Sequence, residues 1–202
     1  MAGSSKRYTD LIRRLGDLRQ NLLHFLPAPP LSKTSYTPQE LDLTRSYVLL
    51  AHAEIEAFCE DLATAKAQAA KRAFVVHGKI SPSLRRMIMY YVAKEKKSWS
   101  EVANPSPQTV DSASQSHLDG IENNNGVKRQ NIEKLFYPVG MTEPHFDATW
   151  LAQMDSFGRS RGDWAHRSIR LLNLPDPASE VAHVEKLLIG LLDLDRKMSR
   201  RR

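Results

Sequence analysis

The sequence predicts an all-α protein, a helical bundle of about five to six helices with one long polar loop. Two observations lead to this prediction. Apolar residues recur at every third or fourth position over most of the 202-residue chain, which is the spacing of one buried helix face. Prolines and capping residues separate these segments, and no repeat and no convincing pair of strands interrupts them.

The first two helices have the clearest boundaries. Residues 5–26 carry the apolar positions of one face and end at a cluster of prolines, which lack the amide hydrogen and stop a helix. Thr37 then has the character of a capping residue, with Pro38 at the first helical position and Glu40 three residues after the cap. This second helix is expected to run to about Phe74.

The sequence from residue 81 onward predicts a loop and four more helices. Ser81 and Pro82 begin a third helix by the same logic. Residues 98–125 are rich in Ser, Asn, Gln and Pro and predict a flexible loop or an insertion. Three further helices are expected around 128–136, along the stripe from Trp150 to Ala165, and from 178 onward.

Nothing in the chain demands more than one domain, and a single domain over residues 1–202 is expected. Within it we expect an N-terminal helix in 1–30, a bundle core over 37–195 that contains the loop of 98–125, and a basic tail at 196–202.

Composition narrows the functional classes. The formal charge of +6 fits a phosphate-rich partner such as RNA, although part of it lies in the basic tail, where a helix dipole also favours cations. The single cysteine, Cys59, excludes an internal disulfide. Residues 1–14 lack the apolar run of a signal peptide, and no window is apolar enough to span a membrane. A cytoplasmic location is therefore expected.

Familiar metal and phosphate motifs are missing. The sequence has no His-Glu-x-x-His, no set of cysteines for zinc and no Gly-rich phosphate loop. No metal and no cofactor are therefore expected, and Cys59 has the pattern of a core residue. Acidic residues of the second helix are interpreted mostly as a solvated face; they are Glu54, Glu56, Glu60 and Asp61.

One pair of residues is a candidate for chemistry. Arg161 and His166 lie five positions apart. A histidine can act as general acid or base on RNA while an arginine neutralises charge on the phosphate, without metal. Spacing alone does not select this pair, because Arg19 with His24 and Arg72 with His77 share it.

Helical geometry separates the two side chains of this pair. Residues five apart point about 140° apart on an ideal helix, so a shared site needs a bend, a groove between helices or a second subunit. Arg161 continues the apolar stripe of Trp150, Met154 and Phe157. A charge on that stripe indicates a functional position or a structural ion pair, for example with Asp163 or an acid of the second helix.

Four stretches resemble the HEPN family (higher eukaryotes and prokaryotes nucleotide-binding domains), and its subgroup associated with L-PSP-type ribonucleases most of all. They are residues 46–58, residues 131–136 with Gly140, residues 160–166, and the closing helix from 178. The resemblance implies a HEPN-like helical bundle that forms a homodimer, with Arg161 and His166 of both subunits facing one cleft. It also implies a metal-independent endoribonuclease, often a toxin or a phage-defence effector with an antitoxin or defence-system partner protein.

The sequence departs from the family pattern beside the motif. Gly162 stands where the family commonly has a polar residue, and Arg167 stands where a glycine commonly follows the histidine. Arg159 precedes His166 by seven residues, almost directly above it on a helix. Arg159 and Arg167 are therefore expected to add RNA contacts, with exposed surface charge as the alternative.

Three functional hypotheses follow from these residues. The chain is an RNase, or a non-catalytic dimeric module that binds RNA or a partner protein through the same cleft, or a purely structural helical domain.

Overall fold

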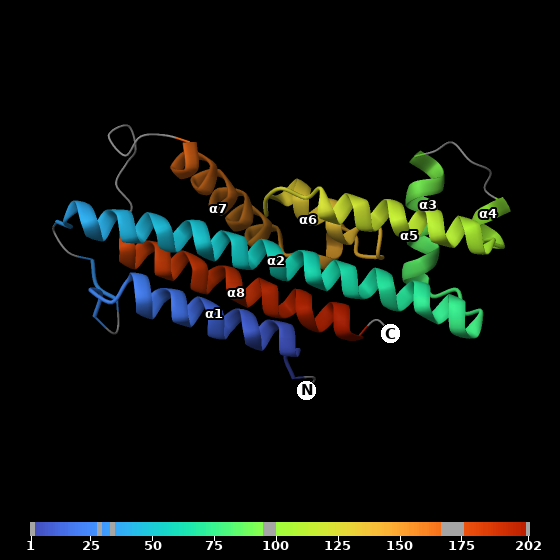
Figure 1. Ribbon diagram of the computed structural model, residues 1–202, viewed down its shortest axis with the longest axis horizontal. Helices are drawn as coiled ribbons and strands as arrows, with labels where there is room; N and C mark the ends of the chain where they lie inside the picture. The colour runs from blue at the N-terminus through green and yellow to red at the C-terminus, as the bar shows by residue number, and fades with distance from the viewer. Residues whose placement is uncertain (1–2, 28–29, 33–34, 95–99, 167–175, 201–202) are drawn as a thin grey trace. The chain divides into compact units, whose positions relative to one another are not determined.

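In the computed structural model, residues 3–27, 30–32, 35–94, 100–166 and 176–200 are described, and no strand occurs among them (Figure 1). This confirms the all-α prediction. The elements are α1 (Lys6–Leu22), α2 (Pro38–His77), α3 (Pro82–Lys94), α4 (Ser100–Ala103), α5 (Pro107–Glu122), α6 (Arg129–Phe136), the 3-10 helix η1 (Glu143–His145), α7 (Ala148–His166) and α8 (Pro177–Arg200).

The cap predicted for the second helix is present. The Thr37 N–H donates to the Glu40 carboxylate at 2.8 Å, and the Glu40 N–H donates to the Thr37 hydroxyl at 3.2 Å. Each side chain thus satisfies a backbone donor that the helix itself leaves unpaired. α2 continues to His77 and ends at Gly78, whose φ of +63° suits a residue without a Cβ.

The prediction of a flexible loop over residues 98–125 is wrong for most of this range. α4 and α5 occupy Ser100–Ala103 and Pro107–Glu122. The hydroxyl of Ser106 caps α5 by accepting the Thr109 N–H at 3.1 Å. The buried face of α5 is built from small, polar and few apolar residues, which is why hydropathy concealed it; they are Thr109, Val110, Ala113, Ser114, His117 and Ile121.

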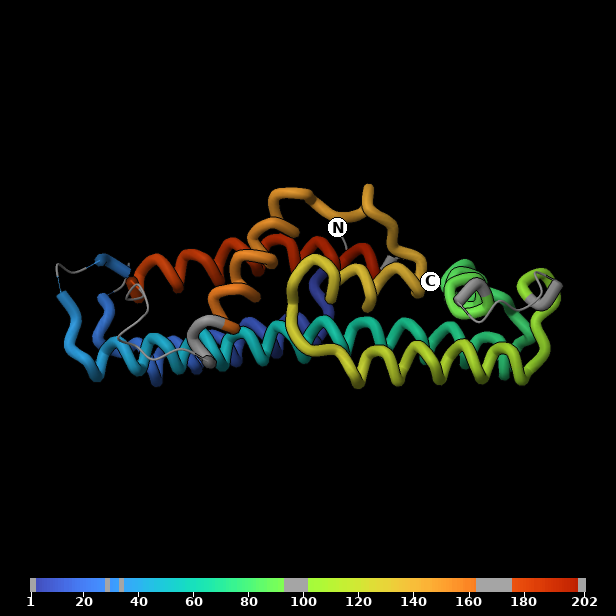
Figure 2. The backbone as a smooth tube through the Cα atoms, turned by 90° about the horizontal axis from the view of Figure 1, so that it is seen from above, coloured from blue at the N-terminus to red at the C-terminus, as the bar shows by residue number. Residues whose placement is uncertain are grey.

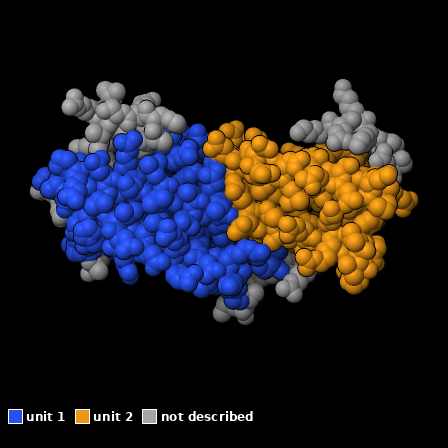
Figure 3. All heavy atoms as spheres, in the orientation of Figure 1, with its two compact units in different colours: residues 1–58, 126–129, 147–199 blue, residues 59–125, 130–146, 200–202 orange. Residues whose placement is uncertain are grey.

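The chain divides into two compact units, coloured separately in Figure 3. Unit 1 comprises residues 1–58, 126–129 and 147–199, and unit 2 comprises residues 59–125, 130–146 and 200–202. α2 contributes its first half to unit 1 and its second half to unit 2. The single domain expected from the sequence stays a prediction.

Unit 1 packs α1, the first half of α2, α7 and α8, and α1 lies alongside both α2 and α8 (Figures 1 and 2). Tyr8 of α1 contacts both α2 and α8. Its ring centroid lies 6.1 Å from that of Phe58 on α2, and its hydroxyl donates to the Leu188 carbonyl on α8 at 3.0 Å. The indole N–H of Trp150 on α7 donates to the carbonyl of the neighbouring residue of α8, Leu187, at 3.1 Å. This hydrogen bond holds α7 against α8.

Unit 2 packs the second half of α2 with α3, α5 and α6. Lys71 of α2 pairs with Asp111 of α5 at 2.8 Å. The Tyr91 hydroxyl of α3 lies 3.2 Å from Nδ1 of His117 on α5. Cys59 is fully buried, which confirms its interpretation as a core residue. None of the described helices combines the length and the apolarity needed to cross a membrane.

Candidate functional site

α7 carries both Arg161 and His166, the arginine and histidine with four residues between them that form the Arg-x4-His motif. The Asp147 carboxylate starts this helix by accepting the Trp150 N–H at 2.7 Å, and the backbone stays helical through His166. No bend therefore brings Arg161 and His166 together within the helix. The side chain of His166 and the whole of Arg167 lie outside the described residues.

The buried stripe of α7 leads directly to Arg161. Trp150, Met154 and Phe157 are each at most 5% exposed, and Arg161 follows one turn later as a half-buried residue. The stripe predicted from the sequence is thus present. Arg159, by contrast, is exposed.

His52 of α2 is the residue that the fold brings toward Arg161. Its side chain is only 2% exposed, and its ring stacks on Phe157 at 5.6 Å with an interplanar angle of 27°. Burial, and secondly the positive charge of Arg161, lower the pKa of His52 to about 4. His52 is therefore neutral at pH 7, and Arg161 lies close enough to act on it electrostatically.

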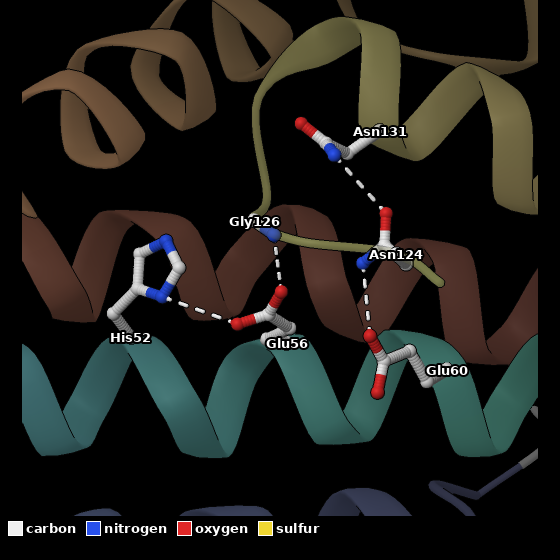
Figure 4. Close-up of polar contacts among 6 residues, drawn as sticks. All are labelled: His52, Glu56, Glu60, Asn124, Gly126 and Asn131. Atoms are coloured by element: carbon white, nitrogen blue, oxygen red, sulfur yellow. Dashed lines mark hydrogen bonds and ion pairs between the residues drawn. The ribbon is translucent and has the colours of Figure 1, made fainter. Parts of the chain in front are cut away.

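Glu56 lies one turn after His52 and uses its two oxygens differently (Figure 4). One oxygen is 3.6 Å from Nδ1 of His52, which is too long for a hydrogen bond and is not an ion pair while the histidine is neutral. The other oxygen accepts the N–H of Gly126. Glu56 therefore acts chiefly as an anchor for the chain that enters α6.

Arg161 has no anionic partner among the described side chains, where it forms neither an ion pair nor a hydrogen bond. The structural alternative of an ion pair with an acid of α2 is thus not observed. The side chain of Asp163, the other acid considered, lies outside the described part of the chain.

The two competing Arg-x4-His pairs have different surroundings. Arg19 forms an ion pair with Glu185 at 3.2 Å, and His24 is an exposed residue beyond the end of α1. Arg72 and His77 are both exposed near the end of α2. Arg19 is half-buried like Arg161 and follows the buried Leu11 and Leu15 of α1, but Glu185 compensates its charge. Of the three arginines, Arg161 is therefore the half-buried one without an anionic partner among the described residues.

Comparison with known families identifies the fold. The family model described as RiboL-PSP-HEPN matches residues 9–189, which include both motif residues. The chain belongs to the RiboL-PSP-HEPN family. No curated protein and no solved structure matches it.

The RiboL-PSP-HEPN match also contains a separate polar network in unit 2 (Figure 4). The Asn124 amide donates to Glu60 at 2.9 Å, and Asn131 donates to the Asn124 side-chain oxygen at 3.1 Å. Asn131 is only 8% exposed. This network ties the start of α6 to α2, so Glu60, like Glu56, belongs to a structural contact and not to a solvated face.

A second histidine packs on Phe157 in the RiboL-PSP-HEPN core. His183 of α8 meets the Phe157 ring edge-to-face at 5.5 Å. Burial lowers the pKa of His183, although a hydrogen bond to the backbone of Gln153 opposes this shift. Phe157 therefore lies between two uncharged rings, His52 on α2 and His183 on α8. No group of three or more potential metal ligands occurs in the described ranges.

Sequence reasoning did not select His52, His183 or Glu56. A signal for His52 was present, because it falls on the apolar face of α2 four residues after Val48 and three before Ile55. A histidine on such a face must be buried and satisfied or functional. Glu56 lies in the stretch 46–58 that resembles the family, but its contact could not be predicted locally, since its partner is the backbone of a residue seventy positions away.

Proposed function

We propose that this RiboL-PSP-HEPN protein is a metal-independent endoribonuclease that acts through Arg161 and His166 at the cleft of a homodimer. Family membership supports RNA as the ligand class, and the net charge of +6 suits a polyanion.

The environment of Arg161 is the observation that carries this proposal. Arg161 is half-buried, its charge acts on the neutral ring of His52, and no described carboxylate compensates it. A partly desolvated cation without a partner is unfavourable, and an entering anion relieves this cost. The planar fork of arginine matches the oxygens of a phosphate.

The proposed reaction is transesterification. The ribose 2′-oxygen attacks the adjacent phosphorus, the bond from phosphorus to the 5′-oxygen breaks, and a 2′,3′-cyclic phosphate and a 5′-hydroxyl result. His166 accepts the proton of the 2′-hydroxyl as general base, and the leaving 5′-oxygen takes up a proton from water. Arg161 stabilises the charge that develops on the phosphate.

The geometry of α7 supports the proposed homodimer. An unbent helix directs positions 161 and 166 about 140° apart, so one copy alone does not present both groups to one phosphate. Two-fold symmetry would place two copies of each residue around a single cleft. Arg159, and Arg167 by its position in the sequence, would contact the flanking RNA backbone.

A non-catalytic RNA- or protein-binding dimer is the second candidate function. Gly162 favours it, because the residue after the motif arginine offers no polar side chain here. A toxin or phage-defence role in the cytoplasm, with an antitoxin or another defence-system partner, would fit either candidate.

One assay separates the candidates. Purified protein is incubated with tRNA and mRNA in EDTA, and the new ends are analysed for cyclic phosphate. We expect cleavage by the wild type and none by Arg161→Ala or His166→Ala. His24→Ala and His77→Ala, which alter the two other Arg-x4-His pairs, serve as matched controls and should cleave normally. Binding without cleavage would support the non-catalytic module, and cleavage by His166→Ala at the wild-type rate would refute the site.

A further inference from the structure

The segment from Gly126 to Arg129, which connects α5 to α6, is held at both ends within unit 1. At its start the N–H of Gly126 donates to Glu56 of α2, and φ at Gly126 is +121°, a conformation that favours glycine. At its end the N–H of Arg129 donates to Asp155 of α7 at 2.8 Å. The segment between these anchors is therefore positioned against α7.

Lys128 lies in this segment, and its alkyl chain passes over Gly158 of α7. A Cβ added at Gly158 would lie 2.7 Å from Cγ of Lys128 and 3.6 Å from its Cε. The first distance is far inside van der Waals contact, so the lysine stem occupies the space that only a glycine leaves open. Lys128 is half-buried, and its stem has lost much of the freedom of a surface lysine.

Gly158 lies between the directions of the two motif residues. On an ideal helix it is about 60° from Arg161 on one side and about 80° from His166 on the other. Along the axis it precedes them by about 4.5 Å and about 12 Å. Lys128 thus places a positive charge over the part of the α7 surface that lies between positions 161 and 166.

No described acidic side chain pairs with the ammonium group of Lys128, so this group is available to bind an anion. Among the described residues it forms no ion pair and no hydrogen bond. Asp155, the acid on this part of α7, uses one carboxylate oxygen for the Arg129 N–H. A positioned lysine without an anionic partner, one turn from Arg161, suits a second phosphate group.

We infer that Lys128 binds a backbone phosphate of the RNA strand, next to the phosphate at Arg161. This inference rests on the proposed function and extends it with a residue from outside the Arg-x4-His motif.

The test measures RNA affinity as a function of salt. His166→Ala serves as the parent, so that a labelled single-stranded RNA oligonucleotide is bound and not cleaved. Adding Lys128→Gln, which keeps the Cβ and Cγ methylenes beside Gly158 and removes the charge, should weaken binding about three- to tenfold. It should also reduce the slope of log K against log salt by about 0.7, the value for one phosphate contact on a single strand. Lys128→Arg should retain the parental slope.

Lys6→Gln is the matched control, because it removes the same charge from an exposed position of α1, and it should change neither affinity nor slope. A parental slope in Lys128→Gln would refute the inference about Lys128, even if its affinity fell, because such a loss would come from packing alone. Failure of the parent to bind RNA at any salt concentration would instead refute the proposed RNA site, and the role of Lys128 with it. An unchanged circular dichroism spectrum and melting temperature would establish that each variant is folded.

Discussion

His52 and His117 are buried and neutral, and each has a place that a charged ring would disturb. His52 packs on Phe157 in unit 1, and His117 lies beside the Tyr91 hydroxyl in unit 2. Burial lowers the pKa of each to about 4, and for His52 the charge of Arg161 adds to this effect. Neither ring is therefore suited to exchanging protons at neutral pH, and the role of general acid or base stays with His166 in our proposal.

Acid should destabilise the protein through these two histidines. Their pKa in the unfolded chain is near 6.5, above the folded value, so the unfolded state binds more protons between these limits. Stability should thus be complete above about pH 6.5 and fall as the pH is lowered toward 4, by about 2 kcal/mol per histidine between pH 7 and pH 5. Urea unfolding at both pH values measures this. His117→Gln should flatten the dependence, and His24→Gln, at an exposed position, should leave it unchanged.

Glu56 and Glu54 provide a second comparison at the scale of single residues. Glu54 forms a surface ion pair with Arg14 at 2.9 Å, whereas Glu56 is 17% exposed and accepts the Gly126 N–H. Glu56→Ala leaves that donor unsatisfied and should lower the free energy of unfolding by about 1–3 kcal/mol. Glu54→Ala should lower it by less than about 1 kcal/mol. Equal effects in a denaturant titration would show that the anchor is dispensable.

Elements of this chain differ in how their contacts are encoded. The long apolar faces of α2 and α8 can be recognised from the sequence. α5 instead buries a face of small and polar residues, and its sequence was mistaken for a loop. The contact between α7 and α8 depends on a glycine, which leaves room for a bulky side chain of the other helix. The ring of Trp150 lies against Gly190, where an added Cβ would overlap the indole.

Gly190→Ala should therefore destabilise the protein. Overpacking of this kind costs about 1–3 kcal/mol, and here it exceeds the gain in helix propensity of about 1 kcal/mol from replacing glycine by alanine. Gly16→Ala is the matched control, since Gly16 also lies inside a helix and nothing is within 4 Å of its added Cβ. That variant should be slightly more stable than the wild type. Thermal unfolding of both proteins gives the comparison, and a neutral Gly190→Ala would contradict the packing of α7 on α8.

For the whole molecule, the proposed function requires a partner copy. The backbone of α7 is helical through His166, and the described residues show no bend that would join Arg161 and His166. We expect a dimer in sedimentation velocity at micromolar concentration. A monomer under these conditions would count against a shared cleft.

Mixing two inactive variants tests the shared cleft more sharply. Arg161→Ala and His166→Ala should each be inactive alone. After mixing and subunit exchange, heterodimers would hold one intact Arg161 and one intact His166 in the same cleft, so that part of the cleavage activity should return. No recovery, with exchange verified by differently tagged subunits, would mean that each site uses residues of one chain alone.

Much of the fold was determined by the sequence itself. Apolar periodicity and the cap at Thr37 identified α1, α2 and α8 because these signals are local, and the order of the motif segments indicated the family that residues 9–189 then matched. Arg161 was selected by its place in the motif of the family that the chain resembles, with weaker support from its position on the stripe of Phe157.

Only the tertiary structure decided which residues surround that stripe. His52, His183 and Lys128 come from three separate segments, and each meets α7 through side-chain packing that no local pattern encodes. Only the structure showed that part of the polar stretch 98–125 is α5, because burial of a small residue depends on what packs against it and not on its own hydropathy. The sequence indicates which residues can be buried. The packing of the helices decides which neighbours bury them, and it thereby decides that His52 is neutral and that Lys128 lies over Gly158.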